Sequence, residues 1–140
     1  FELARRGDSQ LDPDNKPSVK TPDEVFNLVK GSLKDKKKEH FWALLLDTRS
    51  RLIKNAEISV GSLDSSIVHP REVFKEALAA SAASVIFVHN HPSGDPHPSD
   101  DDIELTKRLT EAGKVMGIEV VDHVIIGNSK FLSLKREGLL

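Results

Sequence analysis

The chain has 140 residues, of which 38% are hydrophobic and 30% charged, with a net charge of −2 and no cysteine. These values describe a single globular domain that can bury a core without disulfides. They exclude a disulfide scaffold and a membrane-spanning run of roughly 18 apolar residues, and they give no sign of direct nucleic-acid binding. The absence of cysteine is compatible with a reducing cytosol, so we expect a cytoplasmic protein without membrane contact.

The first twenty residues are predicted to lie outside the domain. Phe1 to Arg6 is typical of the tail of a preceding helical region, and residues 7–20 are polar and proline-bearing, as linkers are. At Thr21 the pattern changes: Thr-Pro-Asp-Glu combines a capping residue, a first-turn proline and two acids that complement the helix dipole. We therefore place the domain at residues 21–140. The apolar face of this first helix is predicted to be Val25, Leu28, Val29 and Leu33.

The next elements alternate between strands and a helix. The basic stretch 34–38 is interpreted as the solvated end of the first helix rather than a nucleic-acid patch. Residues 41–46 are all apolar, which indicates a strand covered on both faces. A turn at 47–51 predicts that residues 52–60 form a second, antiparallel strand. Residues 70–83 are predicted to be helical, and the positions expected to be buried are Val73, Ala77, Leu78 and Ala80.

The last third of the chain predicts one more strand, a helix and two final strands. These elements cover residues 84–88, 99–116, 119–126 and 130–134. The inward positions of the last helix are expected to be Ile103, Leu105, Leu109 and Ala112. The predicted order along the chain is one helix, two strands, a helix, a strand, a helix and two strands. This order predicts an α/β domain with a mixed sheet and helices on its faces.

A pair of histidines at the end of one predicted strand is the main chemical signal. His89 and His91 follow an apolar run, and residues two apart in a strand point to the same face. Asp102 lies at the start of the next helix and supplies an oxygen donor. A catalytic zinc uses three protein ligands and leaves the fourth position to water, whereas a structural zinc usually takes four ligands rich in cysteine. The pattern therefore predicts a zinc site of the catalytic kind.

Neighbouring residues leave alternatives open. Ser99 and Asp102 also match a helix-start signature, in which the serine caps the helix, and the two functions are compatible. Asp100 or Asp101 would replace Asp102 if the helix register were shifted. His97 is interpreted as an exposed loop residue rather than a fourth ligand. His123 is interpreted as a buried strand histidine, with a position behind the metal ligands as the alternative.

A hydrolytic zinc site also needs a base that takes a proton from water. The candidate glutamates are Glu39, Glu57, Glu72, Glu76 and Glu104. Glu39 directly precedes the buried strand 41–46, whose beginning can neighbour the end of the histidine-bearing strand. Spacing alone favours Glu39 only slightly over Glu72.

The histidine motif resembles a known family. The motif has the pattern His-x-His-x7-Ser-x2-Asp, formed here by His89, His91, Ser99 and Asp102. This pattern is similar to the JAMM motif of the JAB/MPN metalloprotease superfamily. The fuller string from His89 to Asp102, with His69-Pro70-Arg71-Glu72 before it and Asp122-His123 after it, is similar to the RadC family of bacterial proteins over about residues 21–140. This resemblance implies a three-layer α/β/α MPN/JAB (cytidine-deaminase-like) fold with one zinc. It also implies that a helix-hairpin-helix-like region precedes the domain.

The resemblance also implies roles for five residues. His89, His91 and Asp102 would bind zinc, Ser99 would donate a hydrogen bond to the oxyanion, and Glu39 would be the general base. The expected function is a zinc metallopeptidase that cleaves peptide or isopeptide bonds of a peptide or protein substrate. The rival is a metal-stabilised interaction module without turnover in a DNA-repair-associated protein; the family carries a DNA-repair name, but no residue pattern here supports that role. An open metal position beside an intact base favours the enzyme, and a filled fourth position favours the module.

Overall fold

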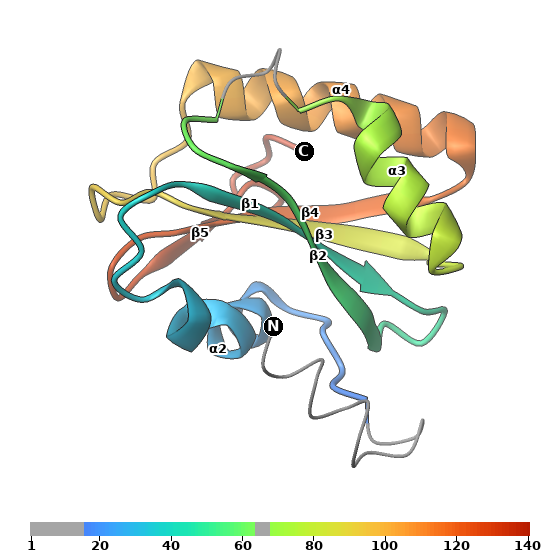
Figure 1. Ribbon diagram of the computed structural model, residues 1–140, viewed down its shortest axis with the longest axis horizontal. Coiled ribbons are helices and arrows are strands. Elements are labelled where there is room, and N and C mark those ends of the chain that lie inside the picture. Colours follow the sequence, from blue (N-terminus) through green and yellow to red (C-terminus); the bar gives the residue numbers. More distant parts are fainter. Residues whose placement is uncertain (1–15, 64–67) are drawn as a thin grey trace.

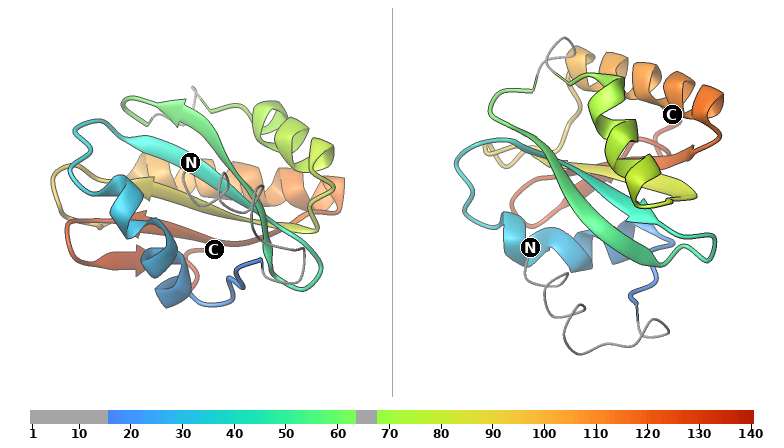
Figure 2. Two further views of the ribbon diagram at one scale, coloured as in Figure 1. Left: turned by 60° about the horizontal axis from the view of Figure 1, so that its bottom comes forward. Right: turned by 45° about the vertical axis from the view of Figure 1, so that its right-hand side comes forward.

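One five-stranded mixed sheet forms the centre of the molecule. The computed structural model describes residues 16–63 and 68–140. The strands are β1 (His40–Leu46), β2 (Leu52–Val60), β3 (Ser84–Asn90), β4 (Glu119–Ile126) and β5 (Phe131–Ser133), and the helices are α2 (Pro22–Leu33), α3 (Pro70–Ala79) and α4 (Asp100–Met116). Figures 1 and 2 show α3 and α4 on one face of the sheet and α2 on the other. The predicted three-layer α/β/α fold and its order of elements are confirmed.

The strand order brings three chain segments together at the same end of the central strands. The order is β2-β1-β3-β4-β5, with β1 antiparallel to both β2 and β3, and β3 parallel to β4. The parallel pair is connected through α4, as a parallel crossover requires. As a result, the beginning of β1 and the carboxyl ends of β3 and β4 meet on the same side, where the loop into α4 also starts (Figure 1).

Alternation along β1 and β3 builds two separate cores. Both strands are buried almost throughout, which explains why their sequences are apolar at every position. One core lies under α3 and α4 and takes its β1 and β3 side chains from Phe41, Ala43, Leu45, Val85 and Phe87. The other lies under α2 and takes them from Trp42, Leu44, Leu46, Ile86 and Val88.

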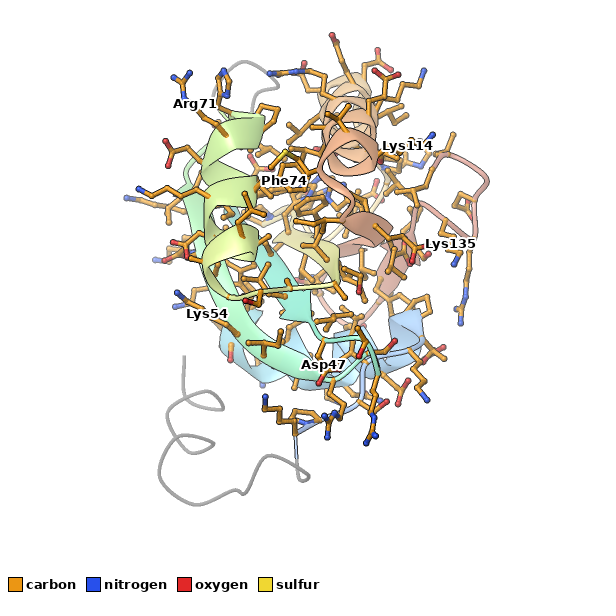
Figure 3. The ribbon with its side chains drawn as sticks, turned by 90° about the vertical axis from the view of Figure 1, so that its right-hand side faces the viewer. Asp47, Lys54, Arg71, Phe74, Lys114 and Lys135 are labelled. Carbon is orange, nitrogen blue, oxygen red and sulfur yellow. The ribbon has the colours of Figure 1, made fainter. Side chains whose placement is uncertain are left out.

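Helix α3 is shorter than the sequence predicts, and it buries different residues. It ends at Ala79, because Ala80 caps it and Ser81 turns into the left-handed region at φ 54°. Leu78, predicted to be buried, is 53% exposed, while Phe74 is buried instead. Figure 3 shows Phe74 pointing from α3 toward α4, where its ring lies close to Gly113. The predicted inward face was therefore wrong at Leu78.

The segment before α2 belongs partly to the domain. Residues 17–20 were predicted to be linker, but the Val19 amide donates to the Ser50 carbonyl and the Leu52 amide to the Pro17 carbonyl, both at 2.8 Å. Val19 is buried in the core under α2. The predicted tail of a preceding helix, Phe1 to Arg6, lies outside the described residues. No helix within those residues combines the length and the apolar character needed to cross a bilayer.

Candidate metal centre

Strand pairing brings both histidines and Glu39 to the same corner of the sheet. Phe41 of β1 pairs with His89 of β3. Because the strands are antiparallel, Glu39, two residues before Phe41, lies on the side of His91, two residues after His89. The alternation of strand side chains turns all of these toward the face that α4 covers.

The three predicted zinc ligands converge on one point. Nε2 of His89 lies 3.2 Å from Oδ1 of Asp102, and Nε2 of His91 lies 3.1 Å from Oδ2 of the same carboxylate. His89 is fully buried, and Asp102 is 1% exposed. A strand end and a helix start thus place two nitrogen donors around one carboxylate.

Ser99 holds the helix start on which Asp102 lies. The Asp102 amide donates to Oγ of Ser99 at 3.1 Å, and the Ser99 amide donates to Oδ2 of Asp102 at 2.8 Å. This reciprocal pair is a capping box with aspartate in the place of the usual glutamate. Asp100 and Asp101 are exposed, so the helix register selects Asp102. The capping interpretation of Ser99 is confirmed, and Asp102 lies beside both histidines.

A buried hydrogen-bond chain determines which nitrogen of His89 carries its proton. Thr106 donates its hydroxyl proton to the Asp102 carbonyl at 2.7 Å, so its oxygen must accept from Nδ1 of His123, 2.6 Å away. Nε2 of His123 is then an acceptor, and Nδ1 of His89, at 2.8 Å, donates to it. Nε2 of His89 is left with a free lone pair near the Asp102 carboxylate. His123 thus lies in a strand, as expected, and directly behind His89.

His91 presents its Nε2 in the same way. Its Nδ1 lies 2.8 Å from the Asp95 backbone carbonyl, which can only accept, so Nδ1 carries the proton. Two imidazole lone pairs and a carboxylate then face one another. Such an arrangement needs a positive charge among the three groups, which either a proton on an imidazole or a metal cation supplies.

The pKa shifts follow from this crowding. Burial lowers the pKa of His91, but the Asp102 carboxylate and the Asp95 carbonyl outweigh it, so the pKa is raised overall. Burial raises the pKa of the Asp102 carboxyl, but the imidazoles of His89 and His91 hold it far below its usual range. Burial, with the neighbouring His89, lowers the pKa of His123 well below its ordinary value. His123 is therefore neutral, as its place in the hydrogen-bond chain requires.

Two buried side-chain atoms of the described residues lack a hydrogen-bond partner, Oδ1 of Asn55 and Nε2 of His89, and the second belongs to the candidate centre. Nε2 of His89 has no hydrogen-bond partner, although Asp102 Oδ1 is nearby, because the two atoms are not aligned for a bond. Leaving a buried polar atom unsatisfied costs about 1–3 kcal/mol. An atom with a free lone pair in this position fits a metal ion, since imidazole and carboxylate are donors that zinc accepts.

Glu39 lies beside the histidines. One donor atom from each of Glu39, His89 and His91 lies within 4.8 Å of the others, a spacing that can hold one metal ion. Oε2 of Glu39 accepts a hydrogen bond from the Leu63 amide at 2.9 Å. The Asn90 side chain bonds on both sides of Glu39, since its Nδ2 donates to the Lys38 carbonyl at 3.0 Å and its Oδ1 accepts from the His40 amide at 2.7 Å.

The other candidate bases have different surroundings. Glu57 pairs with Nδ1 of His40 at 2.6 Å, and Glu76 pairs with Lys54 at 3.2 Å. Glu72 and Glu104 are exposed residues of α3 and α4. His97 is exposed, as expected. Of the five glutamates considered, Glu39 alone belongs to the described cluster with His89 and His91.

Sequence reasoning missed two residues of this corner. Thr106 follows Asp102 by one helical turn, so its position on the same face was the available signal. Asn90 stands between the two histidines and points to the opposite face. Its partners, Lys38 and His40, are about fifty residues away in the chain, and nothing local predicts them.

Comparisons with known proteins found one matching family model and many similar relatives. A family model described as "RadC-like JAB domain" matches residues 19–139. The chain is 55% identical over 139 residues to a "UPF0758 protein" of Desulforudis audaxviator, covering 99% of this chain and 60% of that protein. It is 50% identical over 140 residues to one of Methanosarcina mazei, covering 100% and 61%, and 51% identical over 138 residues to one of Bacillus cereus strain Q1, covering 99% and 61%. The chain thus spans about three fifths of the length of these relatives.

Proposed function

The chain belongs to the RadC-like JAB domain family, and on that premise we propose that it is a zinc-dependent metallopeptidase that cleaves peptide or isopeptide bonds. The observation that carries this proposal is the convergence of Nε2 of His89, Nε2 of His91 and the Asp102 carboxylate on one point, with the Glu39 carboxylate beside it. In this proposal the first three residues hold the metal, and Glu39 remains free to move protons.

The chain's own residues supply the rest of the chemistry. Zinc, when bound, supplies a Lewis acid that polarises the scissile carbonyl and makes water acidic enough to be deprotonated near neutral pH. Glu39 takes the proton of the attacking water and delivers it to the leaving amine. The Leu63 amide and the Asn90 side chain orient Glu39 for this transfer.

Ser99 has a proton available for the oxyanion. Its Oγ accepts from the Asp102 amide, so the hydroxyl proton is not used by that bond. A hydroxyl directed at the developing negative charge stabilises the transition state more than the ground state. Ser99 therefore both caps α4 and, in this proposal, donates to the oxyanion.

Metal content tests the first half of the proposal. Protein purified without chelator is expected to hold about one zinc per chain, measured by elemental analysis. Glu39→Gln should keep this zinc, whereas His89→Ala together with His91→Ala should lose it. Full zinc content in the double variant would disprove the ligand assignment.

Cleavage tests the second half. Zinc-loaded protein is incubated with a proteome-derived peptide library, and new amino termini are identified by mass spectrometry. We expect cleavage by the wild type and a loss of about 10²–10⁴-fold in rate for Glu39→Gln, because the amide cannot accept the proton.

The same experiment addresses the rival function. Glu39 lies close enough to both histidines to fill the fourth metal position itself, and such a site would be a metal-stabilised interaction module without turnover. Zinc content that falls in Glu39→Gln, together with no new amino termini from the wild type, would favour that module over the peptidase.

A further inference from the structure

We propose that a basic groove beside the metal centre binds an acidic stretch of the polypeptide on which the centre acts. The groove is a hollow of about 680 Å³ whose wall includes Lys30, Lys34, Lys36, Lys37 and His91. The proposal rests on the peptidase function proposed above and adds the chemical class of its substrate. His91 belongs both to the wall of the groove and to the metal centre, so the two adjoin at this residue.

The charge of the groove is concentrated locally. Four lysines and one acid, Asp35, belong to its wall, although the whole chain has a net charge of −2. Among the described residues, none of these lysines has a carboxylate within ion-pair distance. Lys30 lies over the Phe26 ring, with Nζ 5.7 Å from its centroid. Lys36 is close enough to Glu57 to help lower the pKa of that carboxyl, but no described carboxylate forms an ion pair with a lysine of the groove, which therefore presents a net positive charge.

The fold holds these lysines beside the histidines. Helix α2 ends at Leu33, and the chain turns at Asp35, which has a φ of 63°. The far end of the lysine stretch is then tied to β3, because Asn90 Nδ2 donates to the Lys38 carbonyl at 3.0 Å. Asn90 stands between His89 and His91.

The composition of the wall favours a polypeptide over a nucleic acid. Proteins that bind single-stranded nucleic acid usually stack bases on aromatic side chains. Of the described residues, His91 is the only aromatic one that lines this groove. The rest of the wall comes from Leu33 at the end of α2 and from polar and aliphatic residues at the ends of β3 and β4 and in the turn after β4. Lysines in a groove that offers no aromatic surface for bases suit carboxylates, which they bind as point charges.

Binding to short peptides tests the proposal without any need for catalysis. The chelator-treated protein is titrated into fluorescein-labelled decaglutamate, decaglutamine and decathymidylate, and fluorescence anisotropy gives each Kd. We expect decaglutamate to bind most tightly, with an affinity that falls as salt is added. Amide chemical shifts of His91 and residues 127–129 should change during the titration.

Two triple variants locate the binding. Lys34→Gln/Lys36→Gln/Lys37→Gln should weaken decaglutamate binding by at least about fivefold, the effect of losing several exposed charge contacts. Lys75→Gln/Lys107→Gln/Lys114→Gln removes the same charge from exposed residues of α3 and α4, on the opposite face, and should leave the Kd within about twofold.

Several results would overturn the proposal. Equal losses in the two triple variants would mean that only the overall charge matters. Equal binding of decaglutamine would remove the role of charge, and tighter binding of decathymidylate through the same lysines would assign the groove to nucleic acid. The titration uses chelator-treated protein, so a negative binding result does not affect the zinc and cleavage tests. Negative results in those two tests likewise do not affect the interpretation of the binding result.

Discussion

At the scale of single residues, Thr106 and His123 orient His89, a proposed metal ligand. Neither is expected to touch a metal ion, yet their hydrogen bonds determine that His89 presents a lone pair on Nε2. Partners behind metal-binding histidines typically change metal affinity by about 10–100-fold when they are removed. The chain of bonds also returns to the backbone of Asp102, so it connects two of the proposed ligands.

Thr106→Val should weaken zinc binding by about tenfold and destabilise the fold by about 1–3 kcal/mol. Valine has the shape of threonine, but it leaves Nδ1–H of the buried His123 without an acceptor. Zinc affinity is measured by competition with a chelating dye, and stability by urea unfolding of the metal-free protein.

Thr110→Val is the matched control for this substitution. Thr110 makes the same bond one turn later, from its hydroxyl to the Thr106 carbonyl at 2.7 Å, but no histidine contact is described for it. Its zinc affinity should stay at the wild-type value. Equal loss of affinity in both variants would show that the effect comes from the helix and not from His123.

At the scale of elements, the two capping boxes found among residues 16–63 and 68–140 have similar geometry and different surroundings. Thr21 and Glu24 close the start of α2, and Ser99 and Asp102 close the start of α4. Only the second box contains a proposed metal ligand. The pair therefore separates the capping role of a residue from its role at the metal centre.

Ser99→Ala and Thr21→Ala should each destabilise the protein by about 1 kcal/mol, the typical value of a lost cap. Both should lower the melting temperature by a few degrees, measured by circular dichroism. Only Ser99→Ala should also reduce zinc affinity, because it frees the amide of Asp102. An unchanged zinc affinity in Ser99→Ala would mean that the carboxylate is held without the cap.

The contact between α4 and the start of β4 depends on a glycine. A Cβ added at Gly113 would lie 2.5 Å from the Ile118 carbonyl oxygen and 3.2 Å from Val120 Cγ2. The first of these atoms is backbone, so it cannot move aside as a side chain would. A Cβ added at Gly31 of α2, by contrast, meets nothing within 4 Å.

Gly113→Ala should therefore destabilise the protein by about 1–3 kcal/mol, although alanine is the better helix former. Gly31→Ala should stabilise it by up to about 1 kcal/mol, because only the helix propensity changes. Urea unfolding of both variants measures the two effects. A stabilised Gly113→Ala would show that α4 shifts at little cost.

At the scale of the whole molecule, the two cores are complete without a metal. They bury apolar side chains on both faces of the sheet, and the proposed centre lies at the ends of the central strands, next to the core under α3 and α4 and outside the residues that form it. This distinguishes the domain from small zinc modules, which are unfolded without their metal.

Removal of zinc by a chelator should therefore lower the melting temperature and leave the far-UV circular dichroism spectrum at 25 °C unchanged. Free zinc at a hundred times its Kd stabilises a folded protein by about 2.7 kcal/mol, so the loss on chelation should be of that order. Re-addition of zinc should restore the melting temperature. Loss of the spectrum on chelation would show that the metal is structural.

The local features of this molecule were readable from the sequence because they depend on neighbouring residues. Thr21 and Ser99 predicted helix starts, the apolar run 41–46 predicted a strand buried on both faces, and the order of elements predicted the sheet with its covering helices. The spacing of His89 and His91 put both rings on one face. In each case the signal lies within a few residues of the structure that it predicts.

Tertiary structure alone decided which distant groups meet those residues. Glu39 was barely distinguishable from Glu72 by spacing, and only the antiparallel pairing of β1 with β3 brings it to His91. His123 reaches His89 because β4 lies parallel to β3, and Asn90 joins the lysine stretch to the histidines across about fifty residues. Such contacts depend on the order and register of strands, which no short stretch of sequence encodes.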